Sequence, residues 1–169
     1  MTDPALLEAL ERVYGRISRS FIRYVVEMAF PYMAPSGAPG VKEDWERRAL
    51  NALQAWDSDV QAAQRAIFAL LGAEKVHPVL PTWNLEYSQY HMLSPLYLLR
   101  PVIHRMRPHL ATLREEAKAL RGWPEAEAEV ESLLEKEEAH LRGLEALERE
   151  RPRDPPKPAV KKGVSANFW

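Results

Sequence analysis

The chain of 169 residues contains no cysteine and only 7 glycines. Without cysteine, the protein has no disulfide bond, no thiolate chemistry and no zinc site built on cysteine. Scarce glycine, together with long stretches rich in alanine, leucine, glutamate and arginine, favours helices over sheets. The length corresponds to one domain that buries about two-thirds of the surface of its unfolded chain.

Long hydrophobic runs are also missing. No apolar stretch approaches the roughly 20 residues that a membrane-spanning helix needs, and the N-terminus lacks the pattern of a secretory signal. The formal net charge of −1 gives no reason to expect a nucleic-acid partner. We therefore expect a soluble cytoplasmic protein that contacts neither a membrane nor a nucleic acid. Glycine-rich phosphate loops and nucleophile–base motifs are absent, so no catalytic residue is predicted.

Apolar residues recur at steps of three and four in four segments, which is the period of amphipathic helices. The predicted helices cover residues 4–30, 43–71, 95–121 and 124–150. Pro31 ends the first helix because proline disfavours helical backbone in the residue before it. Gly72 and Gly122 are expected to end the second and third helices. The third helix is expected to continue through two internal prolines, because its apolar period continues across them.

Two segments lack a helical period. Between the second and third predicted helices lie roughly twenty residues that include Trp83, Tyr87 and Tyr90, and a connection of that length is unusual in a compact domain. We expect these aromatic residues to hold the connection along the surface of the helices. After Glu150 the sequence becomes proline-rich and basic, so residues 1–150 are predicted to form the helical domain and residues 151–169 an extended arm.

The arm is one clue to function. Its proline-rich spacer, the basic pair Lys161 and Lys162, and the terminal pair Phe168 and Trp169 suit a peptide that docks into a groove of another protein. We predict that these four residues bind a partner protein or another copy of the chain. The alternative is a disordered tail.

The fourth predicted helix carries two polar residues on its apolar stripe. Glu137 falls near the middle of the stripe, and His140 lies one turn further along the same side. Both need partners, because an unpaired buried charge is costly. One interpretation is a structural polar pair, with Arg16 or Arg107 supplying a positive charge from a neighbouring helix.

Four amphipathic helices joined by a short, a long and a short connection predict an all-α four-helix bundle. This arrangement resembles the ferritin-like superfamily, in which one long crossover joins two helical hairpins. Glu137-x-x-His140 resembles one half of that superfamily's di-metal carboxylate site. The resemblance implies a site for iron or manganese, although the second Glu-x-x-His motif expected on residues 43–71 is missing.

Three more residues complete the candidate metal ligands. Asp57 lies near the level of Glu137, but it joins the site only if its helix is rotated toward it; otherwise it is a surface acid. Glu27 lies about ten residues from that level, or roughly 15 Å along the helix axis, so it suits His91 better than Glu137. His91 is otherwise a loop histidine bonded to backbone.

The remaining ring side chains are given structural roles. His104 and His109 are expected to be solvated, whereas Trp45, Trp56 and Tyr24 are expected in the core. Two functions follow from these observations. The chain is either a ferritin-like bundle with a reduced metal site, or a non-catalytic structural or adaptor subunit that docks through its arm.

Overall fold

The computed structural model describes residues 2–29, 41–90 and 93–152. The long helices are α1 (Pro4–Ser18), α3 (Val41–Ala73), α4 (Pro95–Lys118) and α5 (Pro124–Arg149). The shorter elements are the helix α2 (Phe21–Tyr24), the π-helix η1 (Val25–Ala29) and the 3₁₀ helix η3 (Leu85–Tyr90). No β-strand occurs in the described ranges, and the predicted all-α class is confirmed.

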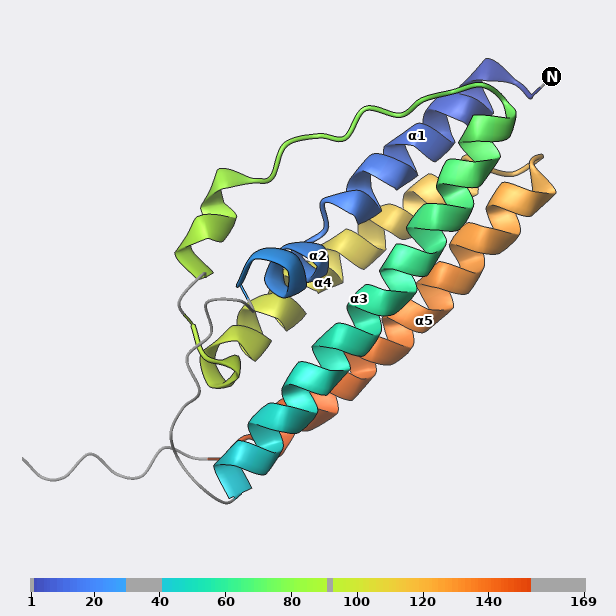
Figure 1. The fold of residues 1–169 in the computed structure, drawn as a ribbon. Coiled ribbons are helices and arrows are strands. Elements are labelled where there is room, and N and C mark those ends of the chain that lie inside the picture. The colour runs from blue at the N-terminus through green and yellow to red at the C-terminus, as the bar shows by residue number, and fades with distance from the viewer. Residues whose placement is uncertain (1, 30–40, 91–92, 153–169) are drawn as a thin grey trace, which may run out of the picture.

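The four long helices lie side by side around one core (Figure 1). Arg48 near the start of α3 contacts Glu150 just after the end of α5, so these two helices are antiparallel. Arg100 at the start of α4 contacts Glu148 near the end of α5, so α4 is also antiparallel to α5. It follows that α3 and α4 run parallel, as a long crossover between them allows (Figure 1).

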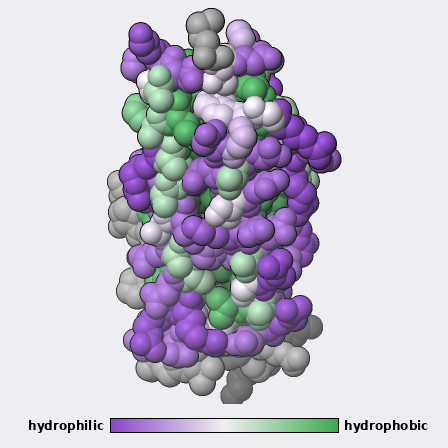
Figure 2. Space-filling view, turned by 90° about the vertical axis from the view of Figure 1, so that its right-hand side faces the viewer, coloured by the Kyte–Doolittle hydropathy of each residue, from purple (hydrophilic) through white to green (hydrophobic). Residues whose placement is uncertain are grey.

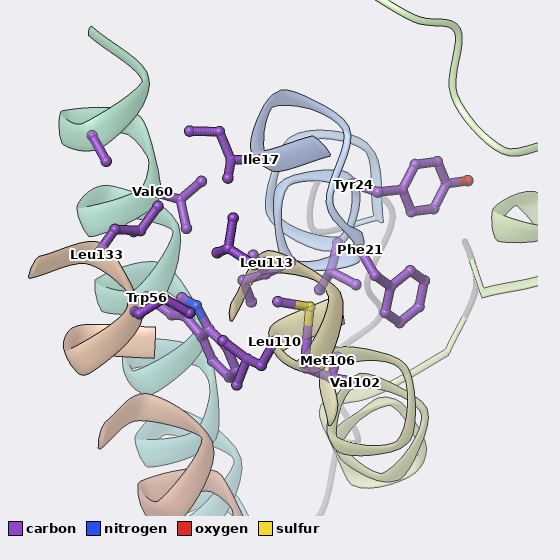
Figure 3. Close-up of a cluster of buried hydrophobic side chains, with 14 of the residues drawn as sticks. Ile17, Phe21, Tyr24, Trp56, Val60, Val102, Met106, Leu110, Leu113 and Leu133 are labelled. Atoms are coloured by element: carbon purple, nitrogen blue, oxygen red, sulfur yellow. The ribbon is translucent and has the colours of Figure 1, made fainter. Parts of the chain in front are cut away.

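Side chains from all four long helices fill the core. Ile17 of α1, Trp56 of α3, Leu110 of α4 and Leu133 of α5 converge there (Figure 3). Trp45, Trp56 and Tyr24 are buried, which confirms their predicted place in the core. The indole N–H of Trp45 donates a hydrogen bond of 2.8 Å to the backbone oxygen of Leu147 and thereby links α3 to the end of α5.

The first predicted helix is not continuous. It breaks at Arg19 and Ser20, where the backbone of Ser20 is extended and the short helix α2 begins after it. Serine favours such N-cap positions over helix interiors because its short side chain competes for backbone hydrogen bonds. The apolar period runs on across the break, from Ile17 to Phe21 and Tyr24, and therefore gave no sign of it.

The second predicted helix ends two residues later than expected. Gly72 lies inside α3, and Lys75 adopts the left-handed backbone conformation, with φ of 61°, that ends the helix. The amides of Lys75 and Val76 return hydrogen bonds to Gly72 and Leu71, which is a Schellman closure. The third predicted helix does continue through Pro101 and Pro108 as one element, α4.

The crossover segment, residues 74–90, returns from the end of α3 along α1 to the start of α4 (Figure 1). The Nε of Arg19 donates a 2.7 Å hydrogen bond to the backbone oxygen of Pro81. The rings of Tyr24 and Trp83 meet edge to face, and Phe21 meets Tyr87 in the same way. These contacts confirm that the segment is ordered along the helices.

The surfaces of the helices are largely polar. The face on the right-hand side of Figure 1 is mostly hydrophilic, with apolar side chains scattered between charged ones (Figure 2). Among the described residues, no helix is long and apolar enough to cross a membrane.

Candidate functional site

Glu137 is the most deeply buried charged residue among those described, with an exposed fraction of 0%. Its Oε2 atom lies 3.3 Å from Nε2 of His109 on α4, whose side chain is only 10% exposed. Neither carboxylate oxygen of Glu137 accepts a hydrogen bond from another described residue. The prediction that His109 is solvated is therefore wrong, while His104 is exposed as expected.

His140 has a different partner from Glu137. Its Nε2 lies 2.8 Å from Oδ2 of Asp59 on α3, and its ring stacks on Trp56 with 5.6 Å between centroids. The Nζ of Lys136 approaches the other oxygen of Asp59 at 3.4 Å. The hydrogen bond from His140, and then the charge of Lys136, lower the pKa of Asp59 from its ordinary value. This group therefore ties α5 to α3.

Asp57 is not a surface acid, because it is only 3% exposed. Arg23 on α2 binds it, with 2.8 Å between Nη1 and Oδ1, and the same guanidinium reaches Glu27 at 3.0 Å through Nη2. Gln61 donates a further hydrogen bond of 2.7 Å to Asp57. A protein cation thus occupies the position between these two carboxylates.

The two arginines proposed as partners for Glu137 bind elsewhere, so that part of the structural interpretation is wrong. Arg16 forms a two-pronged ion pair with Glu116 of α4, and both of its distances are 2.7 Å. The hydrogen bonds that Arg16 donates to the Glu116 carboxylate raise the pKa of Arg16 above its ordinary value. Arg107 pairs with Glu145 on the surface between α4 and α5.

The candidate metal ligands are therefore separated. Glu137 meets His109, His140 meets Asp59, and Asp57 and Glu27 share Arg23. His91 lies outside the described residues, as do Lys161, Lys162, Phe168 and Trp169 of the arm. Within the described ranges, no three histidine or acidic side chains form a group that could hold a metal ion.

The donor set also fits iron or manganese poorly. These ions take four to six ligands, and the Glu137–His109 pair supplies two. The unpaired oxygens of Glu137 are the one observation that favours an additional ligand at this point. With only two protein donors nearby, the site does not fit a resident di-metal centre.

Sequence reasoning missed His109, Asp59 and Arg23 as members of polar groups. A signal existed for His109, which follows the buried Met106 by three residues and so lies beside the apolar stripe of α4. For Arg23, the break at Ser20 sets the rotation of α2, and in that rotation the side chain binds Asp57. That rotation follows from backbone geometry and not from residue spacing.

The crossover segment has an unusual surface. Residues 76–85 include no aspartate, glutamate, lysine or arginine, although 28% of the chain is charged. Val79 is 90% exposed and Leu85 is 89% exposed, and Leu80 between them is also exposed. We refer to these three side chains as the crossover patch. Large apolar side chains this exposed are typical of binding surfaces when they gather in one place.

The fold and these contacts define an all-α protein whose buried charged side chains lie in small separate groups. Comparisons with protein-family models, with curated proteins and with solved structures found no match for this chain.

Proposed function

We propose that this chain is a ferritin-like helical protein that acts as a non-catalytic subunit and associates with a second copy of itself through the crossover patch. The observation that carries the proposal is the exposure of Val79 and Leu85 in a stretch without charged residues. Burying such side chains against another surface is favourable by about 25 cal/mol for each Å² removed from water.

The directions of the helices support the ferritin-like part of the proposal. Helix α5 is antiparallel to both α3 and α4, and the crossover segment lets α3 and α4 run parallel, as expected for two hairpins joined by one long connection. This support concerns architecture alone. The metal chemistry of the superfamily does not follow from it.

The interior polar groups support a non-catalytic role. The guanidinium of Arg23 lies between Asp57 and Glu27, where it neutralises carboxylates that a metal would otherwise have to bridge. Asp59 is likewise engaged by His140 and Lys136. These groups hold α2, α3 and α5 in register, which is a structural role for buried ion pairs.

A second copy is the partner that best suits the crossover patch. Because the patch carries no charge, two identical patches can meet around a twofold axis without repulsion. A patch made to fit a charged partner would need complementary charges at its centre. The chain that follows the patch is packed against the helices, since Arg105 of α4 lies over the rings of Phe21, Tyr87 and Tyr90 at 5.2 to 5.4 Å.

The proposal is tested by sedimentation equilibrium of the purified chain over a range of concentrations. We expect the wild type to dimerise and the double variant Val79→Asp/Leu85→Asp to be monomeric. Dimerisation of the variant would bury two charged aspartates in the interface at the cost of their hydration. The matched control places two aspartates on exposed positions of α5, in Ser132→Asp/Ala139→Asp, and should dimerise like the wild type. A wild type that is monomeric throughout would rule out the second copy as the occupant.

The C-terminal arm carries a separate part of the proposal, namely docking to a partner protein. Arg151 contacts Glu148 and lies over the ring of Tyr97, so a truncation after Pro152 keeps these contacts. Deleting residues 153–169 should abolish co-purification with an arm-dependent partner and leave the crossover-dependent dimer intact. Co-purification that survives the deletion would count against a docking role for Lys161, Lys162, Phe168 and Trp169.

A further inference from the structure

A cleft of about 440 Å³ lies between α1, the crossover segment and α4. Three arginines from consecutive turns line it, Arg12, Arg16 and Arg19, and the carboxylate of Glu116 is the single acidic group in its lining. The lining therefore carries three positive charges and one negative charge, which leaves an excess of two positive charges. Such an excess is unexpected in a chain whose formal net charge is −1.

The guanidinium groups in the cleft keep unused donors. Glu116 occupies Nε and Nη2 of Arg16, which leaves Nη1. Arg19 uses Nε for the backbone oxygen of Pro81, which leaves both of its terminal nitrogens. Arg12 makes only a 4.0 Å contact with Glu8, and its side chain is 56% exposed. Each arginine therefore has N–H groups available to a ligand.

One residue of the lining carries a buried hydroxyl group without a partner. Ser20 lines the cleft and is 3% exposed, and its buried Oγ makes no hydrogen bond with another described residue. Buried hydroxyl groups are normally satisfied, so an unpaired one in a cleft indicates a place for a ligand atom. His109 lies in the same lining, with Glu137 behind it at 3.3 Å.

We propose that this cleft binds a small organic phosphate. Guanidinium groups form planar, two-pronged hydrogen bonds with phosphate oxygens, and a phosphate monoester carries a charge of about −1.5 to −2 at neutral pH, which matches the excess charge of the lining. Ser20 and Tyr87 belong to the same lining, where the Ser20 hydroxyl would supply a further donor and Tyr87 an aromatic ring for the organic part. The inference goes beyond the proposed dimer and does not depend on it.

The test is a titration of the full chain with phenyl phosphate, followed by ¹⁵N-resolved NMR, with inorganic phosphate as a second probe. We expect shifts confined to the lining of the cleft, and tighter binding of phenyl phosphate than of inorganic phosphate because of the Tyr87 ring. Arg12→Gln and Ser20→Ala should each weaken binding about tenfold, the effect of losing one hydrogen bond to a charged group. Neither residue's side chain makes a strong contact within the described structure, so both variants should fold.

The matched control is Arg65→Gln, which removes an exposed arginine of α3 outside the cleft and should leave binding unchanged. Repeating the titration on the Val79→Asp/Leu85→Asp variant separates this inference from the dimer, because a monomer should bind equally well. Binding that Arg12→Gln and Ser20→Ala leave unaltered, or shifts spread over other arginine-rich surfaces, would overturn the proposal. So would the absence of saturable binding for both probes.

Discussion

The interior of the helices and the crossover segment place polar and apolar residues in opposite ways. The interior buries charge, at Glu137 and Asp57, whereas the crossover segment exposes Val79 and Leu85 almost completely. Each arrangement is costly by itself: a buried charge loses its hydration, and an exposed apolar side chain orders water around it. The two regions differ in whether the protein itself offsets that cost.

In the interior, protein groups offset most of the cost. Arg23 and Gln61 bind Asp57, and His109 approaches Glu137. On the crossover segment no described group covers the patch, which points to another surface that does so in an assembly. The comparison teaches that the interior compensates most of its buried charge whereas the crossover patch is left uncovered. Three predictions sharpen this comparison, from the largest expected effect to the smallest.

Removing Arg23 should have the largest effect on the interior. Arg23→Ala leaves Asp57 buried without its cation, and breaking a buried ion pair in this way costs about 3 to 5 kcal/mol. The free energy of unfolding in urea should fall by that amount. Adding Asp57→Asn to the variant should restore part of the loss, and Arg12→Ala, on the exposed side of α1, should cost little. If Arg23→Ala unfolds at the same urea concentration as the wild type, Asp57 does not depend on this ion pair.

Glu137 should behave differently, because its carboxylate oxygens accept no hydrogen bond from a described residue. Replacing such a charge with an apolar side chain of similar length is often neutral or stabilising, so Glu137→Met should raise the free energy of unfolding by about 1 kcal/mol. Wild type and Glu137→Met, both purified without chelator, should not differ in their content of iron or of manganese by elemental analysis. A loss of bound metal together with stability in Glu137→Met would favour the metal site over the structural role.

Replacing Asp59 should change the free energy of unfolding least, and the size of that change should depend on pH. Its pKa is lowered in the folded protein, chiefly by the hydrogen bond from His140, so it stabilises the fold above its ordinary pKa of 3.8. That contribution should disappear as the pH falls below this value and the carboxylate becomes protonated. About a third of the side chain is exposed, so the difference between wild type and Asp59→Asn should stay below about 1 kcal/mol. Thermal unfolding of both proteins from pH 2 to 7 measures the difference. A difference that grows toward low pH would contradict a stabilising role for the ionised Asp59.

Much of the fold was predictable from the sequence. The apolar residues of α3, α4 and α5 follow the helical period, and prolines mark the first positions of α4 and α5. The break at Ser20 was not predictable, because apolar residues continue at helical spacing on both sides of it. The end of α3 at Lys75 was not predictable either. Gly72 is the residue type expected just after a helix end, but it lies within the helix.

The candidate site was less predictable than the fold. Periodicity correctly placed Glu137 on a buried face, but the partner of a buried side chain depends on how neighbouring helices are rotated and shifted. His140 therefore meets Asp59 instead of sharing a site with Glu137, and Asp57 faces Arg23. The crossover patch escaped notice because apolar residues in a connection are expected to pack inward, as Trp83 and Tyr87 do and Val79 and Leu85 do not.

The central claim is that the crossover segments of two copies meet face to face, and the absence of cysteine allows a direct measurement of it. A nitroxide label on Thr82→Cys lies within the patch without removing an apolar side chain, and pulsed electron spin resonance measures the distance between labels on two copies. The account predicts a short, well-defined distance that disappears in Val79→Asp/Leu85→Asp, and a longer one for a label on Ser132→Cys of α5. Labels at Thr82→Cys that are no closer to each other than those at Ser132→Cys would contradict it.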